Sequence, residues 1–365
     1  MRFRVLAGVS AAVLAAALAT AQTFPGRLSD AEFRNLITSL SEPGGTFVTD
    51  NIISNEIALQ DVLPELQRRE RAGAYVGVGP EQNLTYIAAL KPPIAFIVDL
   101  QRGNMLLHLM YKALVELSAD RADCASRLFA RPRPAGLGTD TSALALFSAY
   151  AAVPVSPPLA ASTLDAILGR LVNGHGGHGL ALNAADRQGI ERIHRAIYEG
   201  GPNLRGDFGK SAAIPSWVPS YAEMMSQSDP NGRSQSFLGS EANFAVLKTY
   251  ESNNLVVPIV GDFAGDKALQ GVGDYLRRRR LVVGTFYASN VEDYLFRGDA
   301  WKRFFRNVGA LPIDDHSMLV RTYFTQSLEG MREYIDPMRP MLAAVANGDV
   351  RTYDDLITRS RVPRP

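Results

Sequence analysis

Two glycines and an aspartate stand where a ligand-binding turn would need them. Gly77 and Gly79 close the short apolar run 74–78, and Asp99 ends the next apolar run, 20 residues after Gly79. Glycines let the chain turn tightly and let a ligand approach the backbone before a helix. An acidic side chain at that separation can bind a ribose diol. The pattern predicts an adenosine-containing ligand; the alternatives are a plain strand-to-helix turn, and an Asp99 that caps a helix or pairs with Arg102.

The side chains around this turn discriminate between cofactors. A dinucleotide site favours a third glycine at position 82, where this chain has Gln82, and disfavours an acid beside the pyrophosphate, where it has Glu81. Such an acid would repel each phosphate by about 1 kcal/mol or more. S-adenosylmethionine has no phosphate and carries a sulfonium and an ammonium, so it suits this turn better. The predicted cofactor-binding residues are Gly77, Gly79, Glu81, Gln82, Asn83, Asp99 and Arg102.

Carboxylate and amide side chains follow two later apolar runs. Asp262 comes after the run 255–260, and Asn290 and Glu292 come after the run 281–287. A carboxylate at a strand end can act as a general base if burial raises its pKa. We therefore predict these three as catalytic residues, with Asp262 or Glu292 as the base. Helix capping by Asn290, with Glu292 favourable to the helix dipole, is an equally good interpretation.

Composition excludes several other classes of function. Lys and Arg number 38 against 37 Asp and Glu, so no net field favours nucleic acid or an acidic membrane. The single cysteine, Cys124, rules out an intrachain disulfide and a cysteine-clustered metal site. His175 and His178 lie in a glycine-rich stretch without a third ligand, which favours a flexible loop over a metal site. We predict no metal, a small-molecule partner and no nucleic acid.

Short apolar runs that alternate with helical patterns indicate βαβ units and a parallel sheet. Ser29 and Glu32 have the spacing of a helix capping box. The predicted fold is α/β, a Rossmann-like, doubly wound, mostly parallel sheet whose two halves, 22–130 and 251–365, are separated by a helical insertion at 131–250. Strands are predicted at 74–78, 94–100, 255–260, 281–287 and 318–324, and helices at 29–40, 57–69, 81–90, 104–117, 267–280, 291–308 and over most of the tail from 330.

The first residues have the pattern of a secretory signal peptide. Arg2 and Arg4 precede the apolar run 5–18, and Ala19-Thr20-Ala21 offers a small-residue cleavage site. We expect cleavage after Ala21 and export to the periplasm or beyond; an uncleaved N-terminal anchor is the alternative, although the run is short for a span of about 20 residues. No later stretch reaches spanning length, so no membrane span is expected in the mature chain.

Several segments resemble known families. YVGVGPEQN and AFIVDLQRGN look like motif I and the following acidic strand end of class I S-adenosylmethionine-dependent methyltransferases. That resemblance implies a sheet of methyltransferase type, Gly77 and Gly79 against the methionine moiety, and Asp99 on the ribose hydroxyls. The chain more closely resembles a bacterial protein family without an assigned activity. This second resemblance covers most of the mature chain and is carried by SEPGGTFVTDNIISNE, YVGVGPEQNLTYIAAL, IVDLQRGNMLLHLMYKALVELSADRA, VVGDFAGDKAL and FYASNVEDYLF.

The methyltransferase resemblance also implies a lid, because N-terminal segments of such folds often cover the cofactor. The lid candidates are Glu42, Asp50, Asn51, Asn55 and Glu56. Roles in turns and helix caps explain about half of them equally well. The leading hypothesis is methyl transfer to an unidentified acceptor. S-adenosylmethionine is a cytoplasmic metabolite, whereas the leader predicts export. A second hypothesis therefore stays open, that the chain is an exported, non-enzymatic protein of the same fold that binds a small molecule or an interaction partner. A hydrolase is a third and weaker hypothesis.

Overall fold

The computed structural model describes residues 26–47, 49, 52–68, 73–206, 218–324 and 330–363. The predicted leader at 1–21, with its cleavage site, lies outside these residues. Asp50 and Asn51, two of the lid candidates, lie outside them as well.

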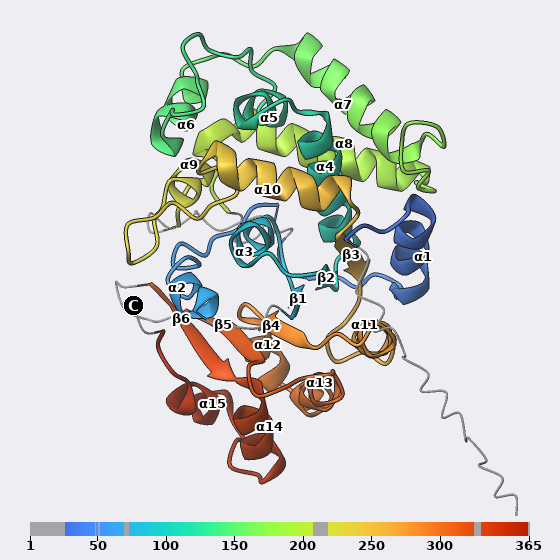
Figure 1. The fold of residues 1–365 in the computed structure, drawn as a ribbon, viewed down its shortest axis with the longest axis vertical. Coiled ribbons are helices and arrows are strands. Elements are labelled where there is room, and N and C mark those ends of the chain that lie inside the picture. The colour runs from blue at the N-terminus through green and yellow to red at the C-terminus, as the bar shows by residue number, and fades with distance from the viewer. Residues whose placement is uncertain are drawn as a thin grey trace, which may run out of the picture.

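One six-stranded sheet organises the molecule, with the strand order β3-β2-β1-β4-β5-β6 (Figure 1). Neighbouring strands are parallel, except that β6 runs antiparallel to β5. This confirms an α/β protein with a mostly parallel sheet, and the strand order is compatible with a Rossmann-like fold. The strands are β1 (Ala74–Gly77), β2 (Ala95–Asp99), β3 (Val256–Val260), β4 (Val283–Tyr287), β5 (Met318–Phe324) and β6 (Met331–Pro337).

Continuous apolar composition explains the central strands. Every residue of β1, β2 and β3 is buried, as expected for parallel strands covered on both faces. Pro258 interrupts β3 without breaking the sheet because β3 is an edge strand, where a missing N–H is tolerated. The register pairs Asp99 with Val260 and Gly77 with Ile97, so the carboxyl ends of these strands meet at one edge of the sheet.

Helices cover both faces of the sheet (Figure 1). On one face lie α3 (Gln82–Leu90), α4 (Arg102–Leu117) and α10 (Glu241–Ser252), and on the other lie α11 (Ala268–Arg278) and α13 (Ala300–Gly309). The helix α1 (Asp30–Leu40) packs beside β3, and its predicted capping box between Ser29 and Glu32 is confirmed. In the described part of the chain, no helix is both long and apolar enough to cross a membrane.

A further layer of helices lies beyond α4 and α10, in the upper half of Figure 1. It is built from the chain between β2 and β3, and all of its members except α5 lie within the predicted helical insertion 131–250. Its members are α5 (Arg121–Leu128), α6 (Ala143–Ala151), α7 (Pro157–Val172), α8 (Ala184–Gly200), the 3-10 turn η1 (Gly201–Asn203) and α9 (Tyr221–Met225).

The secondary structure differs from the prediction at three places. Of the predicted helix 57–69, only α2 (Leu63–Gln67) forms, and the predicted helix 291–308 is divided near Gly298 into α12 (Val291–Phe296) and α13. The tail from 330 begins with β6, not with a helix, before α14 (Met338–Ala346) and α15 (Tyr353–Arg359). Met331, Glu333 and Ile335 of β6 are buried. Because one of these inward residues is a glutamate, the sequence does not show the alternation of apolar and polar residues that indicates a strand.

Candidate functional site

A cavity of about 830 Å³ opens at the carboxyl ends of the parallel strands. In open α/β sheets this edge is where ligands bind, at the point where the strand order reverses; here that point lies between β1 and β4. The volume is within the usual range for small-molecule sites. Its polar lining residues include Thr49, Ser54, Asn55, Glu56, Gln82, Asp99, Gln101, Asp262, Ser289, Asn290, Asp293, Arg297 and Asp354.

Asn83 shapes the turn that follows β1. Its side-chain amide donates to the carbonyls of Val78 (2.9 Å), Gly79 (2.9 Å) and Pro80 (2.8 Å), and its oxygen accepts from the Tyr75 hydroxyl at 2.8 Å. A Cβ on Gly77 would lie 2.1 Å from that same oxygen, so only glycine fits there. Gly77 and Asn83 therefore do not line the cavity, contrary to their prediction as binding residues; they build the turn that does.

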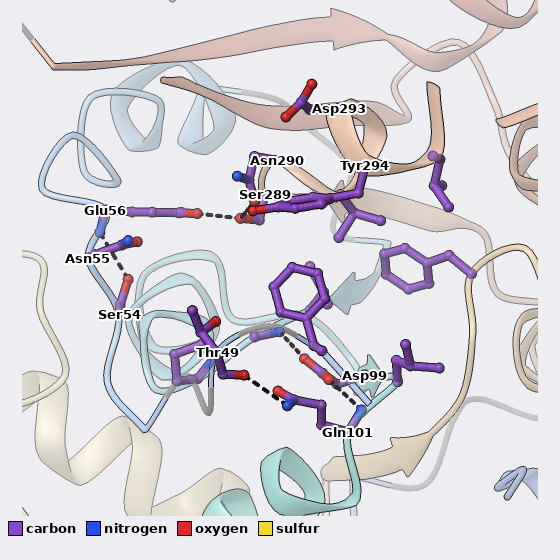
Figure 2. A pocket seen from close by; sticks show the side chains of 18 of the residues that line it. Thr49, Ser54, Asn55, Glu56, Asp99, Gln101, Ser289, Asn290, Asp293 and Tyr294 are labelled. Carbon is purple, nitrogen blue, oxygen red and sulfur yellow. Dashed lines mark hydrogen bonds between the residues drawn. The ribbon is translucent and has the colours of Figure 1, made fainter. Parts of the chain in front are cut away.

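Asp99 and Gly79 meet at the cavity wall, as Figure 2 shows for Asp99. Gly79 has a φ of +82° and donates its N–H to Asp99 Oδ2 at 3.2 Å, while Gln101 N–H donates to Oδ1 at 2.8 Å. Burial raises the pKa of Asp99 to about 6 against these two hydrogen bonds, which favour the ionised form. Each carboxylate oxygen keeps capacity for a ligand donor.

Gln82 and Glu81 point in different directions. Gln82 lines the cavity, and its Oε1 is buried without a partner among the described residues, while its Nε2 contacts the Tyr287 hydroxyl at 3.3 Å. Glu81 is fully buried away from the cavity, where both carboxylate oxygens accept the Ser54 N–H at 3.1 Å. The prediction that Glu81 faces the ligand is wrong: it anchors the segment 52–56, and burial raises its pKa to about 7.

Three other predicted site residues are engaged in holding the fold together. Arg102 forms a two-bonded ion pair with Asp186, at 2.6 and 2.9 Å, and does not meet Asp99. Glu42 accepts the N–H groups of Asp262, Lys267 and Ala268, so it caps the start of α11. The third residue is Glu292, whose partner is described below. Arg102, Glu42 and Glu292 do not line the cavity, so their predicted contacts with a ligand are corrected.

Glu292 is buried in an ion pair with Arg321, whose Nε lies 2.5 Å from Glu292 Oε2. Arg321 is itself fully buried and also pairs with Asp336. This ion pair holds Glu292 outside the cavity lining, so the predicted catalytic role of Glu292 does not fit its position.

Glu56 comes to the cavity from the segment 52–56, opposite Asp99 (Figure 2). Its carboxyl accepts hydrogen bonds from the hydroxyls of Tyr287 and Ser289, at the end of β4. Burial raises its pKa to about 7, while the Ser289 and Thr322 hydroxyls favour its ionised form. Glu56 was predicted as a lid residue; its carboxyl lies in the cavity wall, held by two hydroxyls at the end of β4.

Asp262, Asn55 and Asn290, the remaining predicted residues, also line the cavity. Asp262 Oδ1 accepts the N–H of Ala264 at 2.8 Å, which closes a turn after β3. Asn290 follows Ser289 and begins α12, although its side chain makes no capping hydrogen bond. Asp293 and Tyr294 also line the cavity and were not predicted, although they lie in the helix that begins directly after Asn290.

Acidic side chains dominate the charge of the cavity. The described lining residues include five acids, Glu56, Asp99, Asp262, Asp293 and Asp354, and one base, Arg297. Arg297 already pairs with Asp293. The wall therefore favours a cationic ligand and disfavours phosphates. Within the described ranges no three His, Cys, Asp or Glu side chains form a metal site, and His178 instead contacts Asp30 and Glu116, each at 2.8 Å.

Residues 51–133 and 192–336 match the protein family described as "Domain of unknown function (DUF7790)". The match covers more than half of the chain. The chain belongs to this family. The two matched segments include nearly all of the sheet and the strand ends that form the cavity, and they leave out 134–191, which holds α6 and α7. No curated protein matches the chain.

Proposed function

We propose that this DUF7790 protein binds S-adenosylmethionine in the cavity and transfers its methyl group to a small acceptor. The observation that carries the proposal is Asp99 at the carboxyl end of β2, in a cavity whose described lining holds five acids and one base. A ligand with a sulfonium, an ammonium and a ribose diol complements such a wall, whereas a pyrophosphate does not.

The described residues fit this ligand in two further respects. The unpartnered Gln82 Oε1 is a buried acceptor that a ligand ammonium would satisfy. The positive φ of Gly79 favours glycine, and because glycine has no side chain a ligand can approach the backbone of this turn. Asp99 would hold the ribose hydroxyls through its remaining lone pairs, which its two backbone hydrogen bonds keep oriented.

When bound, S-adenosylmethionine supplies an electrophilic methyl on a positively charged sulfur. The chain's task is then to align an acceptor and to take its proton. Glu56 is the cavity carboxyl best suited to that second task, since burial holds its pKa at about 7, close to the working pH. Tyr287 and Ser289 hold its carboxyl in place through their hydroxyls.

Removing the charge of Asp99 is expected to weaken ligand binding. In isothermal titration, Asp99→Asn should raise the Kd for S-adenosylmethionine and for S-adenosylhomocysteine by about tenfold or more, the value of one lost hydrogen bond to a charged group. The wild-type chain should bind S-adenosylmethionine in the micromolar range and bind NAD more weakly, because NAD carries a pyrophosphate.

The matched control is Asp274→Asn, which removes an exposed acid on α11 that pairs with Arg277. It should leave both Kd values unchanged. Thermal unfolding of each variant checks that the Gly79 turn survives. If the wild-type chain binds neither adenosyl ligand, the proposal fails; binding without transfer to any acceptor would favour a binding protein over an enzyme.

A further inference from the structure

The cavity has two chemically distinct ends. Asp99, Gln101 and Thr49 form one end, joined by hydrogen bonds of Gln101 to Asp99 (2.8 Å) and to the Thr49 carbonyl (2.9 Å). Glu56 and the segment 289–294 form the other, toward β4 and β5 (Figure 2). A ligand at Asp99 therefore leaves the second end free for another molecule.

The second end combines aromatic rings with carboxylates. Its rings come from the segment before β1, from α12, from the end of β5 and from α15; they are Phe47, Tyr294, Tyr323, Phe324 and Tyr353. Phe47 packs edge-on against Tyr294 with ring centroids 4.8 Å apart, and Tyr323 and Tyr353 are 6.1 Å apart. Asp293 and Asp354, which neighbour Tyr294 and Tyr353 in the chain, also line the cavity, and their helices α12 and α15 contact each other. Rings together with carboxylates are what recognises an organic cation.

The chain itself supplies an example of that recognition. The guanidinium of Arg297 lies over the ring of Tyr294, 4.5 Å from its centroid, and pairs with Asp293. The Arg297 side chain is 63% exposed, so a ligand can displace it into solvent at little cost. The same ring and carboxylate would then be available to a ligand cation.

We propose that this end of the cavity binds a primary or secondary organic amine, which is the methyl acceptor. This inference rests on the proposed function for its transfer step, but not for its binding step. In the transfer step, the bound ammonium gives a proton to the Glu56 carboxylate, and its freed lone pair forms a bond to the methyl carbon. The bond between that carbon and sulfur breaks with its electron pair on sulfur, which leaves S-adenosylhomocysteine and a methylated ammonium.

Phenethylamine and its neutral analogue 2-phenylethanol provide the binding test. By isothermal titration of the full chain without S-adenosylmethionine, phenethylamine should bind at least about tenfold more tightly than the alcohol at pH 7. Tyr294→Leu should weaken phenethylamine binding by about fivefold, and Tyr294→Phe should retain it, because the ring and not its hydroxyl faces the cation.

Arg297→Gln should have the opposite effect and tighten phenethylamine binding by about threefold, since it frees the ring and the carboxylate. Tyr198→Leu, on α8 outside the cavity lining, is the control and should change nothing. Equal binding of the amine and the alcohol, or no effect of Tyr294→Leu in a folded chain, overturns the amine site. Either result is independent of whether S-adenosylmethionine binds.

The transfer step makes a prediction for Glu56. Glu56 shares the Thr322 hydroxyl with the buried Glu333 carboxyl, whose pKa the charge of Glu56 raises. With phenethylamine and S-adenosylmethionine both saturating, the single-turnover rate of the wild-type chain should rise with pH through about 7, as Glu56 of this pair loses its proton and becomes a base. Glu56→Gln should lower the rate by about 100-fold and remove this rise. Glu191→Gln, on the exposed surface of α8, should keep both. Amine binding without any transfer would refute the methyltransferase proposal and leave the amine site standing.

Discussion

Replacing Arg321 by alanine is expected to lower the free energy of unfolding by about 3–5 kcal/mol. Arg321 is fully buried on β5 and joins four elements: it pairs with Glu292 of α12 and Asp336 of β6, and it donates to Ser360 Oγ, after α15, at 2.6 Å. Without the guanidinium, two carboxylates stay buried with no cation. Urea unfolding at pH 7, followed by circular dichroism, measures the loss.

Two variants test the reason for this effect. Arg339→Ala removes an exposed arginine that pairs with Asp315 at 2.7 Å, and should change stability by less than about 1 kcal/mol. Adding Glu292→Gln to Arg321→Ala should recover part of the loss, because one stranded charge disappears. A loss of less than about 1 kcal/mol for Arg321→Ala would contradict the buried ion-pair account.

The position of Arg321 also predicts where the damage appears. Its partner helix α12 carries Asp293 and Tyr294, whereas Asp99 ends β2, on the other side of β1. In a destabilised but folded Arg321 variant, amine binding should therefore weaken more than adenosyl-ligand binding.

Raising the pH from about 5 to 9 is expected to destabilise the protein, and Glu251→Gln should remove a large share of that loss. Glu251 is buried at the end of α10, and neither of its carboxyl oxygens has a partner within the part of the chain that the structure describes. The neighbouring Lys112 ammonium instead contacts Glu116, at 2.9 Å, and the backbone carbonyl of Glu251. Burial raises the pKa of Glu251 to about 8.

The direction follows from proton linkage. A carboxyl whose pKa is about 8 in the folded chain and near 4.5 when unfolded holds its proton more tightly in the folded state. Its stabilising contribution is complete below about 4.5 and is lost as the pH rises through 8. For Glu251 alone the loss is on the order of a few kcal/mol.

Glu56, Glu81 and Asp99, with folded pKa values of about 7, 7 and 6, act in the same direction over a lower range. Glu116 acts oppositely: His178 and Lys112 hold its pKa at about 2 despite burial, so its contribution is lost only in acid. Stability should therefore be greatest near pH 5.

Chemical unfolding at pH 5, 7 and 9 tests this. Glu251→Gln should match the wild-type chain at pH 5 and exceed its stability at pH 9. Glu199→Gln, on the exposed side of α8, should follow the wild-type curve throughout. If the Glu251 variant loses as much stability with pH as the wild-type chain, an ionisation of Glu251 is not the cause.

Local patterns in the sequence determined the strands and the turn after β1. Apolar runs predicted β1 to β5 to within about two residues, because fully buried parallel strands need no alternation to be recognised. Gly79 and Asp99 were found because their separation in the chain follows from one βαβ unit. The second edge strand, β6, was missed because its inward residues include a carboxyl, whose burial depends on partners from other elements.

Tertiary structure alone decided which acids face the cavity. In sequence, Glu42, Glu56, Glu81 and Glu292 look alike, each standing next to a strand end or in a polar segment. Glu42 caps α11, Glu81 holds Ser54, and Glu292 pairs with Arg321, so only Glu56 of these four reaches the cavity. The role of an acid depends on which donor the fold brings to it, and those donors lie from 27 to more than 200 residues away in the chain.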